Sequence, residues 1–147
     1  RGREAVVYEE PPSWKIGGSN VICEGSDATL LAIGNLVKAG LDAQKLLGSA
    51  GIRLKVVDCY SIRPIDKQRI LTEAAAHSVL FSAEEHNVTG GFGAAVAEVL
   101  AEAGTSTKLI KIGMPDQYSI LGPPLHLYRH YGMDGEGVAK VIRNSLR

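Results

Sequence analysis

Titratable side chains gather where the apolar runs of this sequence end, at the points where a parallel sheet would present its ligand-facing loops. Six residues share this property: Asp58, Arg63, Glu84, Glu85, His86 and Asp116. Two carboxylates flanking an imidazole could tune the pKa of a proton-transfer group. The alternative is that one carboxylate accepts hydrogen bonds from loop amides, while the others are solvated or face a partner. Because no nucleophile is paired with these groups, the sequence favours the alternative.

A glycine-rich turn follows the densest part of this cluster. Gly90, Gly91 and Gly93 surround Phe92 immediately before a helical pattern, so their backbone amides could hold an anion. The match to a dinucleotide fingerprint is incomplete. Val96 stands at the third glycine, and Lys111 stands where the ribose-binding acid is expected. The glycines therefore favour a tight strand-to-helix turn with close packing, and anion binding remains the alternative.

Two further sets of residues could carry chemistry. His126 and His130 are four residues apart, the spacing of a metal pair on one helix face, but no third ligand is evident, so we predict ordinary surface or interface histidines. Cys23 and Cys59 lack a Cys-x-x-Cys arrangement and are predicted to be inert core thiols. Two cysteines are too few for a disulfide framework, so we expect a reducing, cytoplasmic setting.

Short, nearly continuous apolar runs predict the strands that position these groups. They comprise residues 20–23, 29–33, 54–57, 79–81 and 109–112, with turn or loop residues after each. Continuous apolar runs are typical of strands buried on both faces. Because helical patterns separate them, we predict an α/β fold with three α/β/α layers and a five-stranded, mostly parallel sheet. The first strand is an edge strand that can run antiparallel.

Helices are predicted between and after these strands. Apolar residues at three- and four-residue steps run from Leu36 to Ala50 and from Phe92 to Ala103, and each pattern stops at a glycine. Asp66 is a candidate N-cap for the helix after the third strand. A short helix opens at 123–124, and Asp134 is placed to cap the last one.

Length and composition limit the possible classes of function. The chain has 147 residues, enough for about one domain, and equal numbers of acidic and basic residues give a formal net charge of zero. That balance argues against nucleic-acid binding, and no apolar run approaches the roughly 20 residues that span a membrane. Residues 1–18, with Pro11 and Pro12, are predicted to link residues 19–147 to an upstream domain that is missing here.

Three stretches together resemble the C-terminal domain of the transketolase family, which depends on thiamine diphosphate. They are residues 58–66, residues 84–98, and Gly122-Pro123-Pro124 ahead of the stretch from Leu127 to Asp134. The order and spacing match across nearly the whole chain. Residues 84–98 are the most specific, and their Glu-Glu-His start is closer to transketolases than to 2-oxo acid dehydrogenase β-subunits.

The resemblance implies where the cofactor of the complete enzyme would be held. In the family, thiamine diphosphate and a divalent metal lie between two other domains, so no cofactor or metal is expected on this chain and no residue is assigned a catalytic role. Arg1 resembles an arginine that reaches substrate in the synthase and dehydrogenase relatives. Glu84, Glu85, His86, Gly90 and Gly91 would lie on a loop facing the neighbouring domain or protomer.

The expected function follows from this family resemblance. We expect an assembly and dimer-interface domain of a transferase that moves two-carbon ketol units between sugar phosphates of the pentose phosphate type, inactive alone. Its partners would be the cofactor-binding domains, on the same chain or another subunit, in a homodimer of the complete enzyme. Two alternatives remain. The domain could belong to a 1-deoxyxylulose-5-phosphate synthase or a 2-oxo acid dehydrogenase β-subunit, or it could be a free-standing anion- or nucleotide-binding module.

Overall fold

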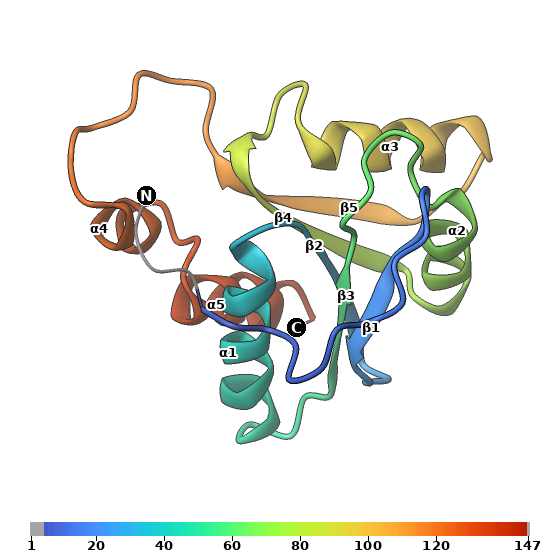
Figure 1. Cartoon of the computed structure of the whole chain (residues 1–147), viewed down its shortest axis with the longest axis horizontal. Coiled ribbons are helices and arrows are strands. Elements are labelled where there is room, and N and C mark those ends of the chain that lie inside the picture. Colours follow the sequence, from blue (N-terminus) through green and yellow to red (C-terminus); the bar gives the residue numbers. More distant parts are fainter. Residues whose placement is uncertain (1–4, 147) are drawn as a thin grey trace.

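A five-stranded sheet with helices on both faces forms the centre of the computed structural model, which describes residues 5–146 (Figure 1). The strands are β1 (Asn20–Cys23), β2 (Ala28–Ala32), β3 (Leu54–Asp58), β4 (Val79–Asn87) and β5 (Lys108–Met114). The helices are α1 (Leu36–Gly48), α2 (Lys67–Ala76), α3 (Phe92–Glu102), α4 (Pro124–His130) and α5 (Gly135–Ser145). The predicted α/β class and strand number are confirmed.

The strands lie in the order β1-β3-β2-β4-β5. The edge strand β1 runs antiparallel to β3, and the other neighbouring pairs are parallel, as the sequence predicts. From β2 the chain first adds β3 on one side and then crosses to add β4 on the other. The strand order therefore reverses between β2 and β4, the position at which open α/β sheets usually bind ligands.

Successive side chains on the central strands point into two separate cores. Leu30 of β2 packs into a cluster with α1 and α5, whereas its neighbour Leu31 packs into a cluster with α2 and α3. Phe81 and Leu80 divide in the same way on β4. Successive side chains of a strand point to opposite faces of the sheet. A strand that is covered on both faces therefore needs apolar residues at nearly every position. Figure 1 shows the two helical layers on opposite sides of the sheet.

Capping side chains fix two of the helix starts. The Asp66 carboxylate accepts the Arg69 backbone N–H at 3.0 Å, and Asp134 accepts that of Gly137 at 2.9 Å. Both predicted caps are confirmed, and each satisfies a backbone donor that the first turn leaves unpaired. The short helix α4 differs from the others because it has no buried residue. No helix in residues 5–146 is both long and apolar enough to cross a bilayer.

Several element boundaries differ from the sequence prediction, most of them by one or two residues, and the end of β4 differs most. β4 continues to Asn87 instead of ending at Phe81, so Glu84, Glu85 and His86 lie on the strand and not on the loop after it. β5 also extends beyond its predicted range, and it pairs with β4 as far as Asn87, with a register shift between Ala83 and Asn87. α1 ends at Gly48, two residues before Ala50. Polar sequence at a strand end reads as loop, although backbone pairing can continue through it.

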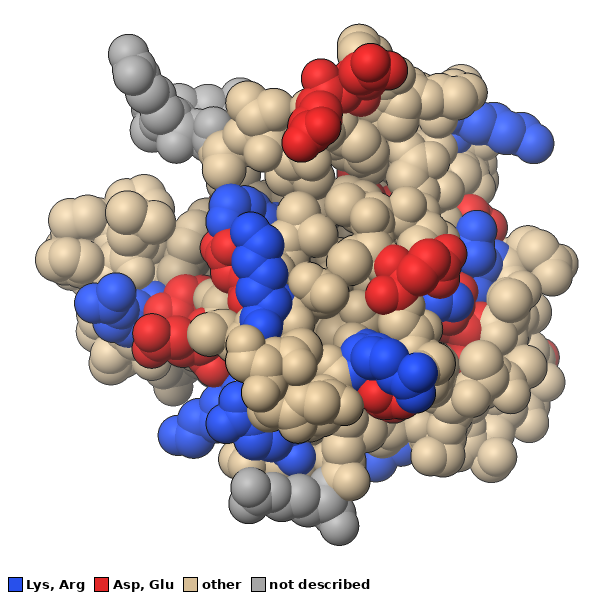
Figure 2. Space-filling model, turned by 90° about the horizontal axis from the view of Figure 1, so that it is seen from below, with Lys and Arg blue, Asp and Glu red and all other residues tan. Residues whose placement is uncertain are grey.

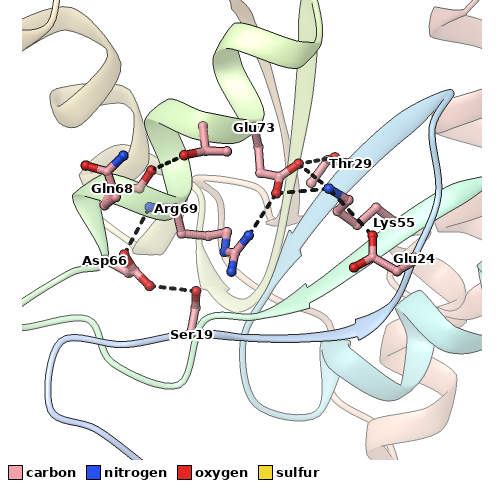
Figure 3. Close-up of polar contacts among 9 residues, drawn as sticks. Ser19, Glu24, Thr29, Lys55, Asp66, Gln68, Arg69 and Glu73 are labelled. Carbon is pink, nitrogen blue, oxygen red and sulfur yellow. Dashed lines mark hydrogen bonds and ion pairs between the residues drawn. The ribbon is translucent and has the colours of Figure 1, made fainter.

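A buried ion-pair network joins α2 to the sheet (Figure 3). The Glu73 side chain is only 1% exposed, and its carboxylate accepts Thr29 Oγ1 at 3.0 Å and Lys55 Nζ at 3.0 Å. Arg69, one turn earlier on α2, lies 3.4 Å away. Burial alone would raise the pKa of Glu73, but the hydrogen bonds from Lys55 and Thr29 outweigh burial and hold the pKa below its usual value.

Acidic and basic side chains are interspersed on the molecular face drawn in Figure 2. That face shows no large patch of side chains of one charge, in agreement with the balanced charge of the sequence.

Candidate functional site at the carboxyl edge of the sheet

Glu84 lies beneath the first turn of α3 and is fully buried. One of its carboxylate oxygens accepts the Phe92 N–H at 2.5 Å, and the other accepts the Gly93 N–H at 2.7 Å. These are backbone donors at the positive end of a helix dipole, which favours a negative charge. The chain therefore supplies an anion of its own to the glycine turn. This is the alternative that the sequence favoured for the acidic cluster, in which one carboxylate accepts hydrogen bonds from loop amides.

The glycines of this turn leave room for Glu84. A Cβ on Gly91 would lie 2.1 Å from Glu84 Oε2, and a Cβ on Gly93 would lie 2.6 Å from Ser82 Oγ. Gly90 has a φ of 77°, in the left-handed region where glycine is the least strained residue. The predicted tight strand-to-helix turn is confirmed, and the amides of Phe92 and Gly93 already have an acceptor.

Glu85 points to the opposite face of β4 and closes the crevice where the strand order reverses. Its Oε1 accepts Asn35 Nδ2 at 3.1 Å and also accepts the Tyr128 hydroxyl from α4. Asn35 directly precedes α1, and its Nδ2 is also 3.5 Å from the Tyr128 hydroxyl. A side chain of this chain thus occupies the usual ligand position of the fold. We call Asn35, Glu85 and Tyr128 the crevice cluster.

Asp58, at the end of β3, contacts the N-terminal segment. Its carboxylate accepts the Tyr8 hydroxyl at 2.6 Å, and Asn20 Nδ2 lies 3.4 Å from the same hydroxyl. Burial raises the pKa of Asp58, and the Tyr8 hydrogen bond partly offsets this rise. The pKa of Tyr8 is also raised, chiefly by burial and then by its bond to Asp58. Both residues line a hollow of about 300 Å³.

The remaining candidates are dispersed. His86 and Arg63 are exposed, and Asp116 accepts Asn87 Nδ2 at 3.0 Å. His126 and His130 are exposed on α4. Between residues 5 and 146, no group of three or more His, Cys, Asp or Glu side chains could hold a metal ion. Arg1 lies outside the described residues.

The two cysteines are free thiols. Cys59 is buried, and burial raises the pKa of its thiol. A buried thiol that resists ionisation is a poor nucleophile, as expected for the core thiol that the sequence predicts. Cys23 is only partly buried.

The arrangement of these groups decides what the edge can do. Glu84 and Glu85 are neighbours in sequence but lie on opposite faces of a strand, so they do not flank the His86 imidazole. Asp58 bonds to Tyr8, and Glu85 bonds to Asn35 and Tyr128. The carboxylates serve the internal architecture of the domain, and the proton-transfer arrangement that the sequence left open is not formed.

Sequence reasoning missed the partners of these carboxylates. Tyr8 bonds to a residue 50 positions away, and Asn35 lies near one 93 positions away. One weak signal existed: Glu73 stands between Ile70 and Ala74 on the apolar face of its helix, where a charge needs a buried partner.

The fold and sequence were compared with known proteins. The family model described as "Transketolase, C-terminal domain" matches residues 17–138. A 1-deoxy-D-xylulose-5-phosphate synthase of Syntrophotalea carbinolica is 38% identical over 134 residues, which cover 91% of this chain and 21% of that protein. A putative transketolase C-terminal section of Methanocaldococcus jannaschii is 34% identical, over 97% of this chain and 45% of that protein.

Solved structures show the same architecture. A structure described as "Split gene transketolase, inactive beta4 tetramer" superposes with a TM-score of 0.89 at 33% identity, over 97% of this chain and 46% of that chain. A transketolase from Pichia stipitis gives a TM-score of 0.66 at 19% identity, over 88% of this chain and 18% of that one, which shows the fold alone. The chain spans about a fifth to a half of the length of these relatives.

Proposed function

Because this chain belongs to the transketolase C-terminal domain family, we propose that it is the assembly domain of a transketolase-like enzyme. The complete enzyme would move two-carbon ketol units between sugar phosphates as a homodimer in the cytoplasm. The resemblance drawn from the motifs is confirmed at the level of the family. The transfer reaction and the assembly role are what we propose beyond it.

The burial of Glu84 is the observation that carries the proposal. Its carboxylate saturates the first amides of α3, which are the anion-binding donors that the glycine turn would otherwise offer. The chemical groups at the carboxyl edge therefore hold the domain together. The exposed residues of that edge, His86 and Gly90, would face the neighbouring domain or protomer.

Thiamine diphosphate and a divalent metal belong to this proposal for the complete enzyme. A diphosphate needs several N–H donors and a metal needs several carboxylate or carbonyl ligands. Among residues 5–146 the α3 amides are bound by Glu84, and no group of metal-ligating side chains is found. The described residues do not fit this cofactor, so we assign its binding to the other domains and derive no catalytic step here.

The contribution to catalysis would be indirect. An assembly domain buries surface against its neighbours and holds an active-site cleft in its productive geometry, which lowers the cost of orienting the reacting groups. The split-gene relative is described as an inactive tetramer, which supports the expectation that this chain alone is inactive.

The test compares rates with and without this chain. Ketol transfer is measured with the upstream cofactor-binding domains alone, with this chain alone, and with both together. Activity that requires both polypeptides supports the assembly role. Equal rates and equal dimer affinity without this chain would contradict it, as would turnover by this chain alone.

A synthase is the second candidate, because the Syntrophotalea carbinolica relative at 38% identity is a 1-deoxy-D-xylulose-5-phosphate synthase. Assaying the reconstituted enzyme for formation of that product separates the two activities. Calorimetry with nucleotides and sugar phosphates on this chain tests the anion-binding alternative, for which the α3 amides are already occupied.

A further inference from the structure

Three large apolar side chains project into solvent between the end of β5 and the first turn of α4. Tyr118 and Leu121 are 103% and 99% exposed, and Leu125 is 77% exposed. Single exposed apolar residues are common on protein surfaces, but three within eight positions form a concentrated patch. Figure 1 shows this segment, in orange, extending away from the sheet before it turns into α4. We call residues 115–125 the apolar arm.

The arm carries little charge. Asp116 is the only acidic or basic residue in it, and Pro123 and Pro124 restrict its backbone near α4. Depletion of charge together with exposed aromatic and aliphatic residues is the composition of the core of a protein–protein interface. Neither nucleic acid nor a polar ligand suits such a surface.

Hydrogen bonds tie the arm to the domain at two points. At its start, Asp116 accepts Asn87 Nδ2 of β4, and at its middle the Ile120 N–H donates to the Tyr131 hydroxyl at 3.1 Å. The crevice cluster holds the following helix, because Tyr128 donates to Glu85. A segment that is already held in place loses less conformational freedom when a partner binds.

The family and the share of the relatives that this chain covers point to the partner. Tyr128 and Tyr131, which follow the arm, pack against the same core cluster as Val7 of the N-terminal segment. The family model is that of a C-terminal domain, and this chain covers 45–46% of two of its relatives, so more than half of each relative lies outside the match. A C-terminal domain is preceded by the rest of its enzyme, and the preceding domain is therefore the partner to which we assign the exposed apolar arm.

We infer that the apolar arm is the surface on which the preceding domain of the enzyme docks, with Tyr118, Leu121 and Leu125 as its anchor residues. The inference rests on the proposed assembly function and adds the residues that carry it. Anchors of this kind account for most of the binding energy of an interface. Glu85 and Asn35 act as positioning residues, because they hold Tyr128 and with it the end of the arm.

The test measures binding between this chain and the preceding half of the enzyme, produced as a separate polypeptide. In the chain that carries both Tyr118→Ser and Leu121→Ser, we expect the Kd to rise at least tenfold. The matched control is Leu46→Ser, since Leu46 is a 42% exposed residue of α1 outside the arm, and its Kd should stay within twofold of the unmodified chain. Equal melting temperatures of the three chains show that they are folded.

Each other outcome overturns the inference in a recognisable way. If the unmodified chain binds and the double variant binds equally well, the arm is not the docking surface, and the assembly function stands. If the unmodified chain does not bind the preceding half, the assembly function itself fails. If light scattering shows that the arm residues join two copies of this chain, and the Kd is unchanged, the arm is a homotypic interface instead.

Discussion

The buried Glu84 carboxylate accepts the backbone N–H of Gly93 at 2.7 Å, so the sheet supplies the acceptor for the start of the helix that follows it. This bond links β4 to the first turn of α3, and its two residues are only nine positions apart in the sequence. It gives an acidic residue at a ligand-facing edge a structural role.

Replacing Glu84 should destabilise the domain. In Glu84→Gln the amide nitrogen of the new side chain faces one of the two backbone donors, and the charge at the positive end of α3 is lost. We expect the free energy of unfolding to fall by about 2 kcal/mol, measured by urea denaturation. The control Glu98→Gln alters an exposed position of α3 and should change it by less than about 0.5 kcal/mol. Equal stability of the two variants would refute the structural role.

The two glycines at 48 and 91 should respond to alanine in opposite directions. A Cβ at Gly91 would collide with Glu84 Oε2 and with the Asn87 carbonyl oxygen, so Gly91→Ala should cost more than about 2 kcal/mol. Gly48 is helical and has no atom within 4 Å of the added Cβ, so Gly48→Ala should gain about 0.5–1 kcal/mol. Thermal melts of both variants check the prediction, which fails if both change in the same direction.

Removing Lys55 should expose the cost of burying a carboxylate whose main cationic partner is gone. Lys55→Met leaves the 1% exposed Glu73 carboxylate without its strongest partner, and we expect a loss of about 3 kcal/mol in urea denaturation. The matched control is Lys67→Met, which breaks an exposed pair with Glu102 and should cost less than about 1 kcal/mol. Similar losses in the two variants would show that burial does not decide the cost.

Glu73 should also make stability depend on pH. Its pKa is lower in the folded protein than its usual 4.5, so the folded state binds fewer protons than the unfolded state. The resulting stabilisation is complete above pH 4.5 and is lost as the pH falls through the lowered pKa. In Glu73→Gln that part of the pH dependence should disappear from the unfolding free energy measured between pH 3 and pH 6. An unchanged acid slope in the variant would contradict the assignment.

Tyr8→Phe should weaken the attachment of the N-terminal segment in a pH-dependent way. The pKa of Asp58 is raised by burial, so its ionised form is disfavoured in the folded protein, and the Tyr8 hydroxyl partly compensates. The variant should lose about 1–2 kcal/mol where Asp58 is ionised, above its raised pKa, and less at pH 3, below both its usual and its raised pKa. Urea midpoints measured from pH 3 to pH 8 provide the test, and a loss that grows as the pH falls would reverse the sign predicted here.

Local sequence signals predicted much of the fold. The β-branched and aliphatic runs located every strand, and Asp66 and Asp134 located two helix starts, because these signals act within a few residues. The boundary of β4 was wrong, because Glu84 and Glu85 look like loop residues when their partners are unknown. A single sequence does not show that the Phe92 backbone N–H will donate to Glu84 or that the Tyr128 hydroxyl will donate to Glu85.

The candidate site was predicted less well for the same reason. The predicted residue types and their place at the carboxyl edge of the sheet were correct. Their hydrogen-bond partners were not predicted: Glu85 bonds to Asn35 and Tyr128, and Asp58 bonds to Tyr8. Those contacts join segments brought together only by the crossovers of the sheet.

Tyr128 sits between two strand ends that in other doubly wound proteins receive a nucleotide or a sugar phosphate. Redesign of this domain as a sensor or a receptor would accordingly start at position 128. Without the Tyr128 hydroxyl, the Glu85 carboxylate and the Asn35 amide would each have a hydrogen-bonding position free for another molecule.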